Sequence, residues 1–196
     1  MYTIGRNTFN EAGNAYDYLV ASPSKKDKDR LSGSQIAKVK TKSAEASSTL
    51  EVASKDGMTY EADHLIDGDM KTTWCEGDKG LGISENITIK LDGGHEIASL
   101  KIYNGFLKDK RRYTINGKAS KLEIDYGNGY TQVVTLGIMD IDDADEELFS
   151  LEEMNPTEVT APANCVTDTI KITILDAEAG SQYKDVGISE VEIFGR

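Results

Sequence analysis

The sequence predicts an all-β protein, an antiparallel β-sandwich preceded by an N-terminal extension. Short segments alternate apolar and polar residues with the two-residue period of a half-buried strand. These segments recur roughly every ten residues, and glycine, aspartate and asparagine mark turns between them. Helical periodicity is almost absent beyond Leu50. Closely spaced strands without intervening helices are typical of antiparallel sandwiches and barrels.

The strand pattern is strongest in residues 86–91, 97–103, 122–126, 131–136, 169–175 and 187–194. Asp92-Gly93-Gly94 predicts a turn between the first two segments. Gly127-Asn128-Gly129 predicts a hairpin between the third and the fourth, because glycine and asparagine adopt the positive φ that tight hairpin turns require.

Two parts of the chain depart from this pattern. Residues 1–45 are predicted to be an N-terminal extension or linker, with a short amphipathic helix over residues 8–20, so the sandwich is expected to span residues 46–196. Residues 138–158 contain nine Asp and Glu and no Lys or Arg. This composition predicts a long solvated loop, with a helical turn over residues 144–153.

The composition excludes several classes of protein. A formal net charge of −12 argues against nucleic acid as a partner, because nothing would replace the counterions of a phosphate backbone. No run of ~20 apolar residues is long enough to span a bilayer. No signal peptide is visible, which fits either a cytoplasmic protein or the mature part of an exported one. Cys75 and Cys165 could pair, but two free and partly buried thiols are the favoured interpretation.

A cluster of oxygen-bearing side chains around one turn is a candidate cation site. Asp67 and Asp69 flank Gly68, Thr72 follows closely, and Glu190 lies in the last predicted strand. Calcium binds ~6–8 oxygens in flexible geometry, from carboxylates, hydroxyls and backbone carbonyls. The alternative is an ordinary turn in which Asp67 accepts hydrogen bonds from backbone amides. The spacing alone leaves both interpretations open.

Polar and aromatic residues of the predicted loops form a second candidate site. A sugar stacks one face on an aromatic ring while Asn, Asp, Glu or Arg bind its hydroxyls, and a sandwich gathers its loops at two ends. The candidate ligand-binding residues are Glu76, Tyr103, Asn104, Lys108, Arg111, Tyr183 and Asp185. Trp74 and Tyr113, in the same segments, are better explained as core packing. The alternative for Asn104 is that it only satisfies a turn, and for Glu76, Lys108 and Asp185 both the functional and the structural interpretation stay open.

Catalysis has little support in the sequence. His64 and His95 are the two histidines, and neither accompanies a nucleophile in a recognised motif. With 34 acidic residues, some pair of carboxylates would always look suitable for glycoside hydrolysis. We therefore expect a protein that is not an enzyme. An enzyme built on the acidic loop is the least favoured alternative.

Six segments together resemble the discoidin-like (coagulation factor type C) domains of the galactose-binding-like superfamily, and most closely the bacterial NADase-type glycan-binding domain. They read ASSTLE (residues 46–51), LIDGDMKTTWCEG (65–77), GLGI (80–83), IYNGFLK (102–108), YTINGK (113–118) and YKDVGISEV (183–191). They occur in the family's order over about three quarters of the chain. Each is weak alone, and their common order carries the resemblance.

The resemblance implies a jelly-roll β-sandwich that binds carbohydrate or glycoconjugates as an accessory module without catalysis of its own. It implies a secreted or cell-surface bacterial protein, in which this chain accompanies other domains. It also implies a structural calcium ion held by side chains of Asp67, Asp69, Thr72 and Glu190. No nucleic acid is expected as a partner.

The chain departs from the family pattern at two positions. Lys118 stands where an arginine is frequent, and lysine cannot make a planar bidentate contact. Phe106 replaces a frequent tyrosine and so lacks its hydroxyl. Both departures favour the alternative function, a structural or protein-interaction sandwich that has lost sugar binding.

Overall fold

The computed structural model describes residues 3–5, 18–20, 35–51, 57–127, 129–139 and 156–196. It divides into two compact units, residues 1–35 and 36–196. In the first unit, β1 (Thr3–Gly5) pairs with β2 (Tyr18–Val20) in an antiparallel ribbon. Residues 18–20 are therefore in a strand and not in the predicted helix. The remainder of that helix, residues 8–17, lies outside the described residues, as do residues 140–155 of the acidic segment.

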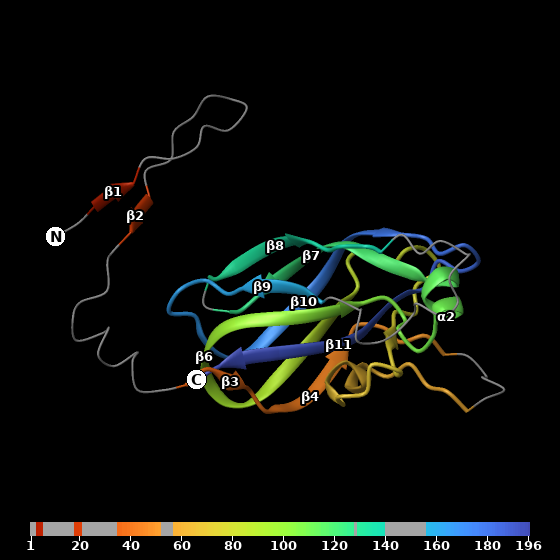
Figure 1. The fold of residues 1–196 in the computed structure, drawn as a ribbon, viewed down its shortest axis with the longest axis horizontal. Coiled ribbons are helices and arrows are strands. Elements are labelled where there is room, and N and C mark those ends of the chain that lie inside the picture. The colour runs from red at the N-terminus through yellow and green to blue at the C-terminus, as the bar shows by residue number, and fades with distance from the viewer. Residues whose placement is uncertain (1–2, 6–17, 21–34, 52–56, 128, 140–155) are drawn as a thin grey trace. The chain divides into compact units, whose positions relative to one another are not determined.

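The second unit is an antiparallel β-sandwich, as the sequence predicts (Figure 1). Its described elements are β3 (Ala37–Lys38), β4 (Thr41–Ala46), the 3-10 helix η1 (Ala62–Ile66), β5 (Trp74–Cys75), β6 (Asn86–Asn104), α2 (Lys110–Ile115), β7 (Gly117–Asp125), β8 (Thr131–Thr135), β9 (Thr157–Thr160), β10 (Val166–Glu178) and β11 (Val186–Gly195). None of the described helices is long and apolar enough to span a bilayer.

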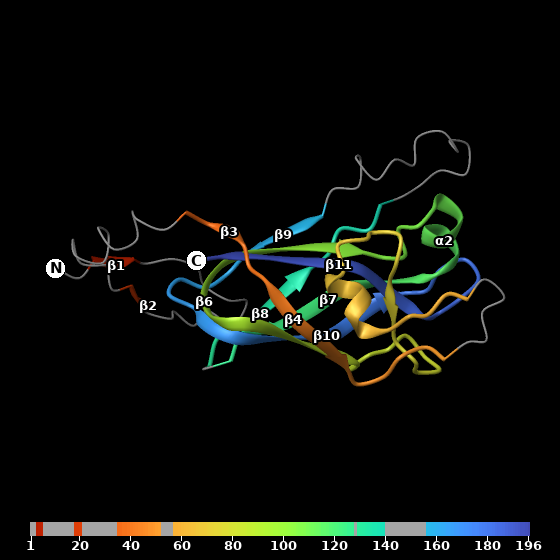
Figure 2. The same cartoon turned by 90° about the horizontal axis from the view of Figure 1, so that it is seen from below.

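Strand β6 belongs to both layers of the sandwich. Its first half pairs with β4 and β10, and β10 continues the layer through β7 to β8. Its second half pairs with β11 and β9, and β11 also pairs with β3 and β5. Figure 2 shows β9 and β11 above the layer that holds β4, β10, β7 and β8. The two layers therefore share one continuous strand at a corner.

The turn predicted at Asp92-Gly93-Gly94 is the point where β6 changes layer. The strand continues through these residues, so the two strands predicted on either side of them are one. The register nevertheless shifts there, because Lys90 lies opposite Thr169 while His95 lies opposite Thr167. The extra residues on β6 bend the strand. The hairpin predicted at residues 127–129 is confirmed, since β7 and β8 pair on either side of it.

The sandwich begins earlier than the sequence suggests. Residues 36–45, which the sequence assigns to the extension, contain β3 and all of β4 except Ala46. Val39 and Ala44 are buried against the core. The core itself is formed by inward-facing Ile, Leu and Val from both layers, with Trp74 and Tyr126 fully buried among them. Alternating burial along β6 and β10 matches the period-two pattern of the sequence.

Candidate functional site

The turn after η1 is closed by its own polar side chains. The Oδ1 atom of Asp67 accepts a hydrogen bond from the Asp69 amide at 2.7 Å, and its Oδ2 accepts from the Thr72 hydroxyl at 2.9 Å. The Asp69 carboxylate in turn accepts from the Lys71 amide at 2.9 Å. Gly68 has φ +80°, a conformation that glycine adopts without strain.

This turn lies against the last strand, as the cation hypothesis requires. The Gly68 amide donates to Oε2 of Glu190 at 3.2 Å, across 122 residues of sequence. Glu190 is 1% exposed, and its other oxygen, Oε1, is buried without a hydrogen-bond partner among the described residues. The Lys38 ammonium lies 3.8 Å from Oε1.

Burial is the main influence on the ionisation of Glu190. Desolvation raises the pKa of this carboxyl to about 7, although the Gly68 amide and Lys38 oppose the rise. The charge on Asp67 raises the pKa further. A buried carboxylate with a second carboxylate nearby and one unsatisfied oxygen has the chemistry that favours a hard cation. However, the described residues contain no group of three or more His, Cys, Asp or Glu side chains that could hold a metal ion, so Asp67, Asp69 and Glu190 do not form such a group.

Glu76 is part of the protein interior. Its side chain is fully buried, with Oε1 accepting from the Val186 amide at 2.9 Å and Oε2 from the Asp78 amide at 2.7 Å. These bonds tie the segment after β5 to the start of β11. Burial raises the pKa of Glu76, and the two amides oppose that rise. The structure therefore gives Glu76 a structural role next to Asp185 and not an exposed position in a sugar site.

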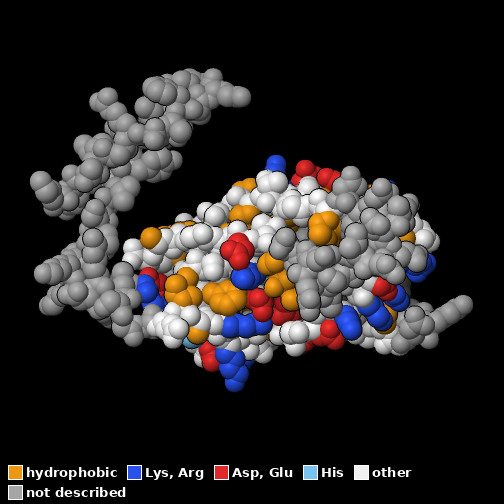
Figure 3. All heavy atoms as spheres, in the orientation of Figure 1, with side chains coloured by type: hydrophobic (Ala, Val, Ile, Leu, Met, Phe, Trp, Pro, Cys, Tyr) orange, Lys and Arg blue, Asp and Glu red, His pale blue; other side chains and the backbone are white. Residues whose placement is uncertain are grey.

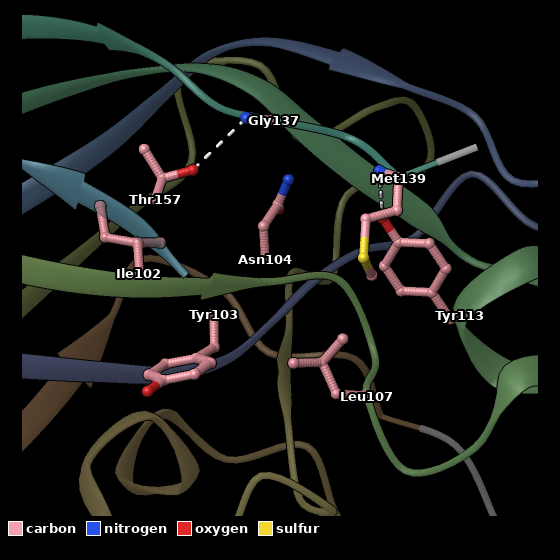
Figure 4. Close-up of a pocket in the computed structure, with 8 residues that line it drawn as sticks. All are labelled: Ile102, Tyr103, Asn104, Leu107, Tyr113, Gly137, Met139 and Thr157. Carbon is pink, nitrogen blue, oxygen red and sulfur yellow. Dashed lines mark hydrogen bonds between the residues drawn. The ribbon is translucent and has the colours of Figure 1, made fainter. Parts of the chain in front are cut away.

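Tyr103 and Asn104 contact a separate, small pocket. Figure 4 shows the two side chains leaving β6 in opposite directions. This pocket has a volume of about 20 Å³, enough for one water molecule but not for a sugar. Asn104 is buried and donates from Nδ2 to the carbonyl of Ala119 at 2.7 Å, and the Tyr103 hydroxyl lies 3.5 Å from Glu192. Neither residue lines the larger pocket.

The other predicted sugar-binding residues do come together. An open pocket of about 280 Å³ lies between α2, the loop before η1 and the loop that joins β10 to β11. It is lined by Leu50, Met58, Tyr60, Phe106, Arg111, Arg112, Ile115, Asn116, Tyr183 and Asp185. Lys108 reaches this pocket indirectly, because its ammonium contacts Sδ of Met58 at 3.3 Å. We call this the α2 pocket.

Short-range contacts hold one wall of the α2 pocket in place. Asp109 caps α2, its carboxylate accepting from the Arg112 amide at 2.8 Å and from the Arg112 guanidinium at 2.6 Å. The guanidinium lies 5.6 Å from the centre of the Phe106 ring. Phe106 meets Tyr60 edge to face, with ring centroids 6.0 Å apart. Arg112 is thereby fixed between a carboxylate and an aromatic ring.

The opposite wall is attached to α2 through backbone hydrogen bonds. The carbonyl of Ile115 accepts from the amides of Gln182 and Tyr183, at 3.2 and 2.8 Å. The Gly117 amide donates to the carbonyl of Asp185 at 2.9 Å. These bonds place Tyr183, which is 43% exposed, and Asp185 beside the arginines of α2.

Several other predictions can be compared with the structure. Trp74 and Tyr113 are 0% and 2% exposed, which confirms their interpretation as core packing. Cys75 and Cys165 are free and buried. Lys118 is 7% exposed and donates to the carbonyl of Asn116 at 2.9 Å, so it does not line the α2 pocket. Of the residues that line the α2 pocket, the sequence predicts only Arg111, Tyr183 and Asp185 as ligand-binding. Met58 and Tyr60 follow no strand or turn pattern, and their only signal is an apolar and an aromatic side chain in a polar loop.

The fold is that of a discoidin-like β-sandwich. Residues 36–194 match the family described as the NAD glycohydrolase translocation F5/8 type C domain, and the chain belongs to this family. Comparison with curated proteins gives no significant match.

Solved structures with the same fold include carbohydrate-binding modules (CBMs), a non-catalytic type of domain, and parts of larger proteins. The family 32 CBM of C. perfringens NanJ in complex with galactose has a TM-score of 0.54 at 20% identity, covering 82% of this chain and 99% of that one. CBM32-3 of a family 31 glycoside hydrolase from Clostridium perfringens gives 0.51 at 17%, covering 81% and 91%. Arabinofuranosyltransferase AftD from Mycobacteria gives 0.53 at 18%, covering 81% and 10%.

Proposed function

We propose that the chain is a carbohydrate-binding module and that the α2 pocket holds the sugar. The observation that carries the proposal is the convergence of Arg111, Tyr183 and Asp185 on one open pocket with aromatic walls. These three residues come from two segments about 70 residues apart in sequence, and their meeting depends on the fold. The family and the likeness to carbohydrate-binding modules support the same function.

The chemistry of the pocket suits a pyranose ring. Tyr183 offers a half-exposed aromatic face against which the apolar side of a sugar can stack. Arg111 carries several donors, and Asp185 is an acceptor, so the two can bind neighbouring hydroxyls. At about 280 Å³, the pocket is near the lower end of ligand-site volumes, which suits one or two sugar units.

The experiment is a glycan array with the full chain, followed by titration calorimetry on the sugars that bind. Tyr183→Ala should weaken binding by about tenfold or more, because it removes the stacking surface. Tyr130→Ala is the matched control, since Tyr130 is 36% exposed but lies in the β7–β8 hairpin. An array without any bound glycan, in the presence of calcium, would contradict the proposal.

We also propose a structural calcium ion at the turn that meets β11. Asp67 and Glu190 would supply carboxylate oxygens, with Thr72, Asp69 and nearby backbone carbonyls as further ligands. The unsatisfied Oε1 of Glu190 supports this proposal. When bound, the ion would neutralise the two neighbouring carboxylates and join the turn to the last strand. Secretion or display at a bacterial cell surface, beside other domains, completes the proposed role.

A second candidate function is a sandwich that keeps the fold but binds a protein instead of a sugar. It is favoured by Glu76 and Lys118, because their polar groups form hydrogen bonds with the backbone inside the protein and so do not face a sugar. The glycan array distinguishes the two functions, because the second predicts no bound sugar.

A further inference from the structure

The α2 pocket carries a positive charge that the molecule as a whole does not. The chain has a formal net charge of −12, yet residues 108–112 read Lys-Asp-Lys-Arg-Arg. Figure 3 shows several Lys and Arg side chains, with Asp and Glu among them, near the end of the sandwich where Figure 1 draws α2. The excess of cations is therefore local to residues 108–112 and does not follow from the overall composition.

The two arginines of the pocket differ in what they bind. Arg112 is paired with Asp109 and packed on Phe106, so its charge is largely compensated within the protein. Arg111 is exposed and lines the pocket, and in the part of the chain that the structure describes its side chain has neither a hydrogen bond nor an ion pair. Lys108 contacts the Met58 thioether, a weak acceptor, and its ammonium forms no ion pair with a carboxylate of the described residues.

Among the described residues, Asp185 is the one carboxylate that lines the pocket, and it makes no ion pair with Arg111. Counting Lys108, Arg111, Arg112, Asp109 and Asp185 gives three positive and two negative side chains. A guanidinium that makes no hydrogen bond or ion pair with any described residue, in a pocket of net positive charge, is suited to bind a carboxylate or sulfate through two parallel hydrogen bonds.

We propose that the ligand of the α2 pocket is an acidic glycan, with Arg111 binding its carboxylate or sulfate group. This proposal rests on the proposed function and specifies the chemical class of its sugar. Tyr183 would stack on the ring, Asp185 would accept from a hydroxyl, and Arg111 would provide selectivity for the charged sugar over its neutral counterpart.

The test compares sugars that differ only in charge. Titration calorimetry with galacturonate against galactose, and with glucuronate against glucose, measures the preference of the full chain. We expect the uronate to bind about tenfold more tightly at low salt, because charge-assisted hydrogen bonds are the stronger ones. The preference should shrink as salt screens the exposed charges.

Two variants distinguish the effect of a charge in the pocket from the effect of the overall charge of the protein. Arg111→Gln should reduce the preference for the uronate by about tenfold, whatever its effect on the neutral sugar. Lys171→Gln removes the same charge from an exposed position on β10, outside the pocket, and should leave the preference unchanged.

The possible outcomes bear differently on the two proposals, carbohydrate binding and the preference for an acidic glycan. Binding of acidic glycans that depends on Arg111 supports both. An array on which neutral glycans bind as tightly as acidic ones overturns the acidic ligand but leaves carbohydrate binding intact. An array on which no glycan binds overturns both. A preference for uronates that survives in Arg111→Gln would show that the selectivity lies elsewhere and would overturn the role of Arg111.

Discussion

At the scale of single residues, Lys118 is an ammonium group inside the protein. It is 7% exposed, donates to the carbonyl of Asn116, and lies 4.6 Å from the centre of the Tyr113 ring. Desolvation lowers its pKa below the ordinary value, although the charge on Glu178 opposes that change. The folded protein therefore releases this proton at a lower pH than the unfolded chain does.

The difference between the pKa of Lys118 in the folded and in the unfolded protein determines how its contribution to stability changes with pH. Between the folded pKa and the ordinary pKa the unfolded chain binds more protons, so the free energy of unfolding contributed by Lys118 rises with pH. We expect Lys118→Met to increase the free energy of unfolding at pH 7 by about 1 kcal/mol, and to remove the alkaline rise. Urea unfolding at about pH 7 and about pH 10 measures both, with the exposed Lys171→Met as the control. A loss of stability at neutral pH would show that the hydrogen bond to Asn116 outweighs desolvation.

Asp67 tests the proposed calcium ion at the same scale. Calcium at about a hundred times its Kd should add about 2.7 kcal/mol to the free energy of unfolding, or roughly 5–10 °C in Tm. Asp67→Ala should abolish the increment. Because this variant also loses the bonds to the Asp69 amide and Thr72, the increment with calcium is the readout and not the stability itself. Asp92→Ala, remote from the turn, should keep it. A wild-type Tm that chelation leaves unchanged would mean an ordinary turn.

At the scale of elements, the long apolar strands are predictable and the short polar ones are not. The sequence predicts the alternating parts of β6, β7 and β10 because these strands bury every second side chain over much of their length. It also predicts β8, whose side chains alternate between exposed and half-buried, and β11, although the first six residues of β11 are all buried. Strand β4 reads Thr-Lys-Ser-Ala-Glu-Ala, and only Ala44 is buried, so its pairing with β6 leaves almost no pattern. Strand β9, with Val159 as its one buried residue, is hidden for the same reason.

The candidate site shows the same limit. The sequence predicts the loops that carry Arg111, Tyr183 and Asp185, and the structure brings those three together. It could not predict that Glu76 faces inward, because the amides that bind it are placed by tertiary structure. Nor could it separate Tyr103 from the α2 pocket, since adjacent strand residues face opposite sides and the inner side is defined only once the layer is known.

Gly180, in the loop between β10 and β11, packs closely against the end of α2 and so helps to position the wall of the α2 pocket. A Cβ at this position would overlap the carbonyl oxygen of Ile115, so Gly180→Ala should force the β10–β11 loop away from α2. We expect a loss of about 1–3 kcal/mol in stability and weaker glycan binding, because Tyr183 and Asp185 move with the loop. Gly93→Ala is the control, since no atom lies within 4 Å of the Cβ it would add. Thermal unfolding and calorimetry measure the two effects. A Gly180→Ala protein that binds normally would show that the loop adapts without moving the pocket.

At the scale of the whole molecule, the question is where the independently folding unit begins. The described core lies within residues 36–196, and the family match begins at residue 36. Removal of residues 36–45 would expose the edge of β6 that pairs with β4. It would also uncover the part of the core that Val39 and Ala44 pack against. The sequence pattern alone would have allowed that removal.

Two truncations test the boundary. We expect residues 36–196 to unfold cooperatively and to bind glycans as the full chain does. Residues 46–196 should lose about 3 kcal/mol or more, because they lack β3, nearly all of β4 and the burial of Val39. The exposed edge of β6 should also promote aggregation. Thermal unfolding and size-exclusion chromatography measure these differences, with the full chain as reference. If both truncations unfold at the same temperature, β3 and β4 do not stabilise the sandwich, and the domain begins near residue 46 after all.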